Sequence, residues 1–422
     1  MHHENKGDPM RAGRQWMAGL FLAAVLGGAQ AGELQWYRGN THTHTFWSDG
    51  GEFPETVADY YKKQGYHFLA LTDHNTFSVG ERWMPLSRKG VEAAIERSVN
   101  RWGPEHLQFR VQDGKTNKMV RVRPLEEVRS LVEEPGRFIL IESLELTSSA
   151  AKGKQVHSNP LNVHGKKSPD LRPQDKAVPI EQRLALHEQV VAQYRAAGSS
   201  PVFWSINHPN YQNSLKAQHL LAVTNANAVE ILNTTRGCFN EGNKAAIQPV
   251  EKIWDEANTM RLQRGLPPLF GMAVDDTHRY DSAVPVLNGP GLAWIMVHSP
   301  ALTADAITAA MARGDFYCSS GITLDTVDFD PAARTLTIAI SPAPGVNYTI
   351  RFVGSVRKDG AVQSGQILQT TPGLRAVYQM TGNELFVRAV VSCDAPKILT
   401  YDNFCDLVPK AWTQPVGWTL AP

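Results

Sequence analysis

The sequence of 422 residues has few cysteines, almost no net charge and no long apolar run. Its four cysteines lack the paired spacing of a zinc finger, which excludes a thiolate zinc site of that kind. Its 42 Lys and Arg residues balance 41 Asp and Glu residues, so the charge indicates no attraction to nucleic acid or to an anionic membrane. No segment reaches the roughly 20 apolar residues that a membrane-spanning helix needs. We therefore expect an ordinary globular protein.

Residues 1–31 have the pattern of a secretory signal peptide. Two arginines precede an apolar run, and Ala29-Gln30-Ala31 has the small-x-small pattern of a cleavage site. We expect the chain to be exported to the periplasm or secreted. Disulfides persist in those compartments, and the spacing of Cys393 and Cys405 favours a pairing between them.

The segment Thr41-His42-Thr43-His44-Thr45 indicates the opening of a metal site. If residues 36–45 form a strand, His42 and His44 point to the same face, so two imidazoles converge on one ion. The turn that follows this strand carries Asp49, a third ligand type. The alternative is a solvated strand edge that holds no ion.

Further metal-ligand types recur downstream at the ends of predicted strands. His74 follows the strand 67–72, and Glu145 ends another. The loop after Glu145 offers His157 and His164 for one place, and the distance to Glu145 favours His157. The full set of candidate metal ligands is His42, His44, Asp49, His74, Glu145, His157, His208, Asp276 and His278.

The order of elements predicts two domains after the signal peptide. Residues 32–320 repeat a strand, a loop ligand and a helix, which is typical of an α/β barrel with its chemistry at the C-terminal strand ends. Residues 78–135 interrupt that repeat, and we interpret them as an insertion that forms a lid or rim. Residues 321–422 show short alternating strands between Gly and Pro turns, which predicts a small all-β sandwich-like domain.

Taken in order, the motifs resemble those of the PHP family, named for polymerase and histidinol phosphatase. The resemblance covers residues 36–320, and its motifs are His-Thr-His with Ser-Asp-Gly, Leu-Thr-Asp-His-Asn-Thr, Glu-Leu-Thr, His-Ser-Asn, Asn-His-Pro and Asp-Asp-Thr-His. The resemblance implies a distorted (β/α)7 TIM-like barrel with two or three metals. The signal peptide and the tail 411–415 look most like the carbaryl-hydrolase-like secreted branch of that family.

The resemblance also implies how the ligands are shared. One metal takes His42, His44, Glu145 and Asp276, a second takes Asp49, His74 and Glu145, and a third takes His157, His208 and His278. Carboxylates and imidazoles without thiolates suit Mn²⁺, Fe²⁺ or Zn²⁺. Glu145 is the expected bridge between ions, and Glu145, Asp276 and His208 are the expected catalytic residues.

This site predicts a multinuclear metal-dependent hydrolase, first of all a phosphoesterase, in which a metal-bridging hydroxide is the nucleophile. A carbamate, ester or amide hydrolase with the same site is the alternative, and a catalytically silent metal- or carbohydrate-binding protein is a second one. We expect a small-molecule substrate. Four basic residues near the site are candidates to hold an anionic one, although solvated charge is the more common role for at least two of them: Lys166, Lys167, Arg236 and Arg279.

Overall fold

The computed structural model describes residues 33–112, 117–171, 177–198, 200–243, 247–280, 289–396 and 407–420. The chain divides into two units, Met1–Glu33 and Leu34–Pro422, and only Glu33 of the first unit is among the described residues. The predicted signal peptide and Cys405 lie outside these residues, so both remain predictions. Within the described ranges, no helix is long and apolar enough to cross a membrane.

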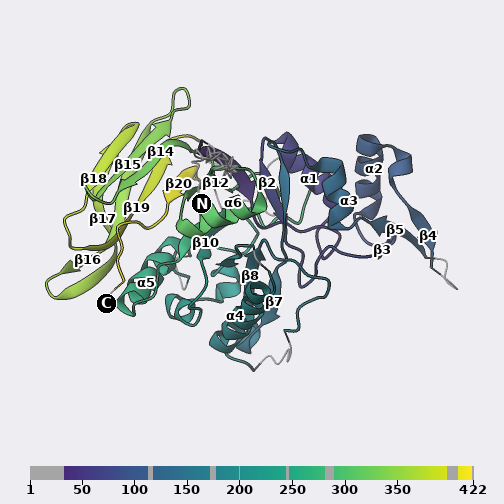
Figure 1. Ribbon diagram of the computed structural model, residues 1–422, viewed down its shortest axis with the longest axis horizontal. Helices are drawn as coiled ribbons and strands as arrows, with labels where there is room; N and C mark the ends of the chain where they lie inside the picture. Colours follow the sequence, from purple (N-terminus) through teal and green to yellow (C-terminus); the bar gives the residue numbers. More distant parts are fainter. Residues whose placement is uncertain are drawn as a thin grey trace, which may run out of the picture. The chain divides into compact units, whose positions relative to one another are not determined.

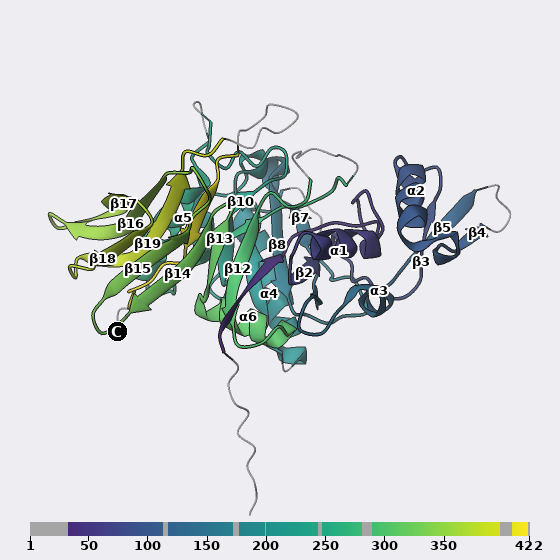
Figure 2. The same ribbon diagram turned by 90° about the horizontal axis from the view of Figure 1, so that it is seen from above.

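A nine-stranded sheet runs through the second unit (Figures 1 and 2). Its strands, in spatial order, are β17 (Ala361–Pro372), β16 (Tyr348–Lys358), β19 (Glu384–Cys393), β20 (Lys410–Thr413), β13 (Phe316–Ser319), β12 (Trp294–Ser299), β1 (Gln35–Asn40), β2 (Phe68–Leu71) and β6 (Ile139–Glu142). Only β1, β2 and β6 run parallel to one another. These three strands end on the same side, which places the loops after them close together.

A five-stranded sheet carries the rest of the candidate ligands. Its strands, in order, are β11 (Phe270–Val274), β10 (Ala228–Asn233), β9 (Phe203–Ile206), β8 (Gln155–Leu161) and β7 (Leu146–Ser149). β11, β10 and β9 are parallel, whereas β8 is antiparallel to both of its neighbours.

The helices fall between strands as the sequence pattern indicates. They are α1 (Pro54–Lys63), α2 (Val91–Trp102), α3 (Leu125–Val132), α4 (Ile180–Ala197), α5 (Val250–Gln263) and α6 (Ala304–Arg313), with short 3-10 turns at Pro104–His106, Ala151–Gly153, Tyr211–Asn213 and Ala217–Leu221. Helix α6 shows how local sequence sets both ends: the Thr303 hydroxyl accepts a hydrogen bond from the Ala306 amide, and Gly314 closes the helix at φ 84°.

The mixed α/β class is confirmed, but the described strands that carry the candidate ligands lie in two separate sheets and form no closed barrel. Among the described residues, the backbones of these two sheets are joined by isolated bridges, between Thr43 and Thr277, between His74 and Glu145 and between Ser143 and Leu161. The predicted strand 138–146 also breaks into β6 and β7, so that β7 and β8 follow β6 as an antiparallel pair with no helix between them. This pair interrupts the strand-helix repeat on which the barrel prediction depended.

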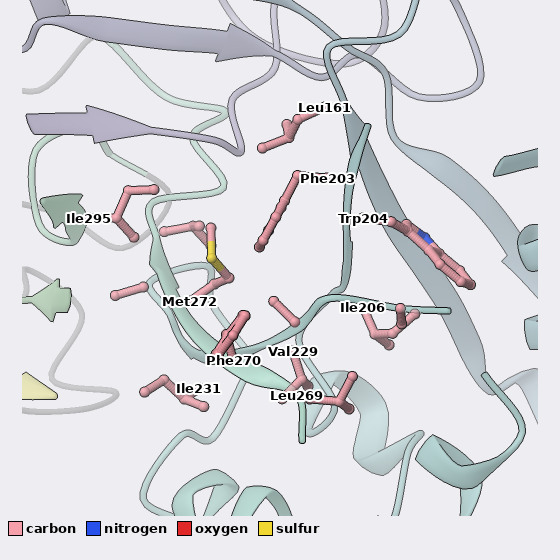
Figure 3. Packing of buried hydrophobic residues seen from close by; sticks show 14 of the residues in the cluster. Leu161, Phe203, Trp204, Ile206, Val229, Ile231, Leu269, Phe270, Met272 and Ile295 are labelled. Carbon is pink, nitrogen blue, oxygen red and sulfur yellow. The ribbon is translucent and has the colours of Figure 1, made fainter. Parts of the chain in front are cut away.

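The main hydrophobic core contains buried side chains from both sheets and from helices α4, α5 and α6. Figure 3 shows Phe203, Phe270 and Met272 on one side of the five-stranded sheet, with Trp204 pointing the other way. All of the β9 and β11 residues are buried, which explains why these strands appear in the sequence as continuous apolar runs. The core fixes the strands whose ends carry the candidate ligands.

The predicted insertion 78–135 has its own secondary structure. A three-stranded antiparallel sheet of β3 (Arg82–Pro85), β5 (Lys118–Val122) and β4 (Phe109–Val111) lies beside α2, as Figure 2 shows. Its core residue Val120 belongs to one hydrophobic cluster with Phe46 and Phe53. The insertion therefore packs against the chain that follows the His-Thr-His motif.

A second small sheet lies at the C-terminal end, formed by β14 (Thr323–Asp330), β15 (Thr335–Ser341) and β18 (Arg375–Gln379). Alternate residues of β15 are buried, as expected for a strand with one face in a core. They share a hydrophobic cluster with Ile350 of β16 and Ala389 of β19. Because β16 and β19 also extend the nine-stranded sheet, sheet pairing continues across residue 320, and the domain boundary there remains a prediction.

Candidate metal centre

The His-Thr-His segment lies just beyond the strand predicted to contain it. Strand β1 ends at Asn40, so the prediction that residues 36–45 form one strand is wrong at its end. The backbone nevertheless stays between two neighbours: the His44 amide donates to the Thr277 carbonyl at 2.9 Å, and the Thr72 amide donates to the Thr43 carbonyl at 2.9 Å. His42 and His44 are fully buried, and their ring centroids lie 5.2 Å apart. The two imidazoles therefore converge as predicted, but without a regular strand.

The turn that carries Asp49 folds back tightly on His44. A Cβ atom at Gly50 would lie 2.4 Å from the His44 carbonyl carbon, so only glycine fits there. Asp73 fixes the start of the turn by accepting hydrogen bonds from the Thr45 amide at 2.9 Å and the Ser48 hydroxyl at 2.6 Å. Asp49 itself is 58% exposed, which places a carboxylate at the mouth of the site.

Glu145 lies between β6 and β7, and five histidines surround its buried carboxylate. His74 Nδ1 lies 2.6 Å from Oε2, while His157 Nδ1 and His42 Nε2 lie 3.1 and 3.3 Å from Oε1. Burial alone would raise the pKa of Glu145, but the surrounding histidines hold that pKa well below its usual range. The carboxylate is thus ionised and central, which is the geometry required of a bridging ligand.

Asp276 directs a second carboxylate at the same histidines. Its Oδ1 atom lies 3.1 Å from His44 Nε2 and 3.3 Å from His42 Nε2. Asp276 has a φ of 51° and His208 a φ of 25°, in the left-handed region that non-glycine residues rarely adopt. Such backbone strain is typical of functional sites, because the surrounding structure must hold the residue there.

Three buried atoms in this cluster lack a hydrogen-bond partner: His42 Nε2, His44 Nε2 and Asp276 Oδ1. The two imidazole nitrogens lie 3.3 and 3.1 Å from the Asp276 Oδ1 atom. Leaving one buried polar atom unsatisfied costs about 1–3 kcal/mol, and a bound cation would satisfy all three at once. Two imidazoles and a carboxylate are ligands that Zn²⁺, Mn²⁺ and Fe²⁺ accept, so the residues fit a divalent metal.

The described residues contain three groups whose ligand atoms are close enough to share an ion. The groups are His42, His44 and Glu145; His44, Asp49, His74 and His278; and His74, Glu145 and His157. The first group contains three of the four residues that the family resemblance assigns to one metal, without Asp276. The others differ from it, because His278 lies 3.4 Å from Asp49 and belongs with His74, not with His157 and His208. His157 and His208 instead both reach Glu145, at 3.1 and 3.5 Å.

His157 and His164, the two candidates for one place, lie in different surroundings. His157 is buried on β8 beside Glu145. The side chain of His164 is 59% exposed, and its Nδ1 lies 2.7 Å from Glu142 Oε2. The geometry thus favours the predicted choice of His157.

Glu230 was missing from the predicted set, although it holds two of the histidines. Its Oε1 lies 2.7 Å from His42 Nδ1, and its Oε2 accepts a hydrogen bond from the His208 amide at 2.8 Å. With Nδ1 occupied in this way, His42 presents Nε2 to Glu145 and Asp276. The sequence held one signal for Glu230: it is an acidic residue inside the apolar run Ala-Val-Glu-Ile-Leu, which forms a buried strand.

Arg88 is a second residue that sequence motifs did not reveal. It comes from the insertion and donates hydrogen bonds to the Ser48 carbonyl at 3.1 Å and to the Gly50 carbonyl at 2.9 Å. These two carbonyls flank Asp49. The insertion therefore holds the Asp49 turn in place from outside the site.

A small cavity of about 90 Å³ opens onto the centre. Its lining consists of seven candidate ligands together with Tyr211 and Thr235: Asp49, His74, Glu145, His157, His208, Asp276 and His278. The Thr235 hydroxyl donates to the Asp276 carbonyl at 2.7 Å, whereas the Tyr211 hydroxyl has no partner among the described residues. The four basic residues expected to hold an anionic substrate are not part of this lining.

Comparison with known proteins adds little. No protein-family model matches the sequence, and no curated protein matches it. One similar solved structure is a two-domain protein from Bacteroides vulgatus with a predicted PHP-like metal-dependent phosphoesterase, at 12% identity and a TM-score of 0.39 over 91% of this chain and 96% of the other. A second is PsfC from Pseudomonas syringae, with 13% identity and a TM-score of 0.32; the match covers 65% of this chain and 87% of the other. A third is an amidohydrolase from Chromobacterium violaceum, with 13% identity and a TM-score of 0.27; the match covers 60% of this chain and 88% of the other. Likenesses this weak do not establish a family, so the function rests on the geometry of the site.

Proposed function

We propose that the chain is a hydrolase that uses two or three divalent metal ions held by His42, His44, Asp49, His74, Glu145, His157, His208, Asp276 and His278. The observation that carries this proposal is the convergence of three unsatisfied buried atoms, His42 Nε2, His44 Nε2 and Asp276 Oδ1. Such an arrangement is costly unless a cation fills it. Mn²⁺, Fe²⁺ and Zn²⁺ all suit this set of nitrogen and oxygen ligands.

The residues divide the work of positioning and stabilisation between them. Divalent ions, when bound here, would supply Lewis acidity and lower the pKa of coordinated water toward about 7. Glu145 would share its two oxygens between neighbouring ligand groups, and Glu230 would fix the orientation of His42. The phenol of Tyr211 is free to donate a hydrogen bond to a substrate oxygen at the cavity.

A phosphoester is the favoured substrate. The small cavity has room for a compact reacting group, which leaves the remainder of the substrate outside. Cations and histidines in that space would stabilise the negative charge of a phosphoryl group. A carbamate, ester or amide hydrolase would use the same residues and is the second candidate. A catalytically silent binding protein is disfavoured, because all nine predicted ligands gather at one place.

Three finer proposals depend on the sequence. The two sheets, joined by isolated bridges, would be a strongly distorted form of the seven-stranded PHP barrel. Residues 1–31 would direct export to the periplasm or the medium. The tail 411–415 would place the chain in the carbaryl-hydrolase-like branch.

A substrate panel separates these candidates. We expect the purified protein, supplemented with Mn²⁺ or Zn²⁺, to hydrolyse phosphomonoesters or phosphodiesters faster than aryl carbamates, with release measured spectrophotometrically. The Glu145→Gln variant keeps the side-chain shape and is the control for contaminating activity. Carbamate turnover alone would replace phosphoester as the substrate, and no turnover in any arm would contradict the hydrolase proposal.

A further inference from the structure

The side-chain amide of Asn207 contacts the carboxylate at the middle of the metal centre. Asn207 directly follows strand β9 and is buried. Its Nδ2 atom donates a hydrogen bond to Glu145 Oε1 at 2.9 Å. Its backbone amide donates to the His157 carbonyl at 3.0 Å, which holds the residue against β8. Asn207 therefore reaches Glu145 from a position that the backbone fixes.

A second buried asparagine continues this contact to the neighbouring sheet. Asn159 lies on β8, and its Oδ1 atom accepts a hydrogen bond from Asn207 Nδ2 at 2.8 Å. Its Nδ2 atom donates to the Thr41 carbonyl at 3.2 Å. Thr41 follows β1 and directly precedes His42. Two amides thus link the segment that carries His42 to the carboxylate of Glu145.

The direction of each hydrogen bond in this chain of amides is forced. A backbone carbonyl can only accept, so Asn159 must turn its Nδ2 atom toward Thr41. Its Oδ1 atom then faces Asn207, which must present its own Nδ2 atom. The opposite orientation of Asn207 would place its Oδ1 atom against acceptor oxygens of both Asn159 and Glu145. One carbonyl therefore sets a chain that ends in an N–H directed at Glu145.

The other end of the Asn207 amide shows what this orientation costs. Its Oδ1 atom is buried and has no hydrogen-bond partner among the described residues. An unsatisfied buried acceptor lowers stability, whereas an apolar side chain of the same shape would avoid that penalty. The donation to Glu145 explains why an amide occupies this position.

The Glu145 oxygen that Asn207 contacts also faces two of the candidate ligands. Oε1 lies 3.3 Å from His42 Nε2 and 3.1 Å from His157 Nδ1. Each of these histidines shares one ligand group with Glu145. The third group does not contain Glu145 and consists of His44, Asp49, His74 and His278. An amide that fixes Oε1 should therefore act on two ligand groups and spare the third.

We propose that Asn207 is a positioning residue of the metal centre, which orients Glu145 Oε1 through the chain of amides that begins at the Thr41 carbonyl. This inference rests on the proposed function, because it gives Asn207 a part in metal binding. A neutral N–H donor suits the place, since it occupies one lone pair of the oxygen without adding a charge that would repel cations. The other lone pair stays available to the ligand groups.

Competition between the full-length protein and a chelator for Zn²⁺ tests the inference. Asn207→Ala should bind the ions of the two Glu145 groups about 10–100-fold more weakly, the effect typical of residues that orient metal ligands. The ion of the Asp49 group should keep its affinity. Asn159→Ala should weaken the same ions by a smaller factor, because it removes the acceptor that directs Asn207 but keeps the donor. This second variant carries the test if Asn207→Ala does not fold.

Asn258→Ala is the matched control. Asn258 is also fully buried, and its amide makes two hydrogen bonds with the Leu269 backbone, at 3.0 and 2.8 Å. This variant should lower the melting temperature and keep the affinity of every ion. Wild-type affinity in Asn207→Ala, or equal weakening of all ions, would overturn the inference and leave the hydrolase proposal standing. A wild-type protein that binds no Zn²⁺ would contradict the proposed function and this inference together.

Discussion

The protein contains two buried ionic clusters that balance their charges in different ways. At α5, Arg388 faces Asp255 with two parallel hydrogen bonds, so a permanent cation meets a permanent anion. At the metal centre, Glu145 and Asp276 face histidines, and the lining contains no Lys or Arg among the described residues. Burial alone would lower the pKa of His74, but Glu145 and Asp49 raise it to about 11. The comparison teaches that the first cluster balances its charges with permanently charged side chains, whereas the carboxylates of the second depend on protonated histidines or on bound cations.

Removing a ligand from the metal centre should have the largest effect. Asp276→Asn preserves shape but removes the charge beside His42 and His44, so we expect kcat/KM to fall by about a thousandfold or more, as expected for the loss of several kcal/mol of Lewis-acid stabilisation. Metal content measured on the same sample should fall as well. Full activity with full metal content would mean that Asp276 is not a ligand.

Breaking the ion pair between Arg388 and Asp255 should lower the stability of the fold and leave the activity unchanged. Arg388→Met leaves Asp255 buried without its partner, which we expect to lower the free energy of unfolding by about 3–5 kcal/mol in denaturant titrations. Arg313→Met is the control, because Arg313 and its partner Asp315 are 56% and 42% exposed and such a pair contributes about 0–1 kcal/mol. If Arg388→Met lost metal at unchanged stability, the two clusters would not be independent.

Glu230 tests whether a residue that orients the candidate ligands affects metal affinity or activity. Glu230→Gln weakens the hold on His42 Nδ1 and the His208 amide, so metal affinity or activity should fall about 10–100-fold. Competition with a chelator measures the affinity. Wild-type affinity together with a lower melting temperature would give Glu230 only a structural role.

Arg88 should give the smallest effect of the four substitutions. Arg88→Met frees the turn around Asp49, and we expect weaker binding of the metal held by the Asp49 group alone, by about tenfold, the equivalent of one hydrogen bond to a charged donor. The neighbouring Lys89→Met, at an exposed position, should behave like wild type. Equal metal affinity in both variants would limit the insertion to a packing role.

Sequence reasoning located the candidate ligands because side chains at strand ends follow from strand order alone. His42, Glu145 and Asp276 were all found in this way, and they meet in the structure. Glu230 was missed because it lies within an apolar strand, where only the register with neighbouring strands shows what a side chain faces. Arg88 acts on backbone carbonyls from an insertion, and no motif encodes such a contact.

The α/β class could be predicted from the sequence, but whether the strands close into a barrel could not. Residues 138–146 look like one apolar strand, and the break before Glu145 depends on the bridge between His74 and Glu145, a contact distant in sequence. The C-terminal strands alternate clearly, but their pairing with β13 through β20 could not be derived from alternation. Long-range pairing decides both features.

The most direct test of the central claim is the metal content of the purified wild-type protein. After loading with Zn²⁺ or Mn²⁺ and gel filtration to remove loosely bound ions, elemental analysis should find two or three ions per chain. The Glu145→Gln variant should lose more than one of them, because Glu145 belongs to two of the three ligand groups. A wild-type protein that retains no metal after loading would contradict the account.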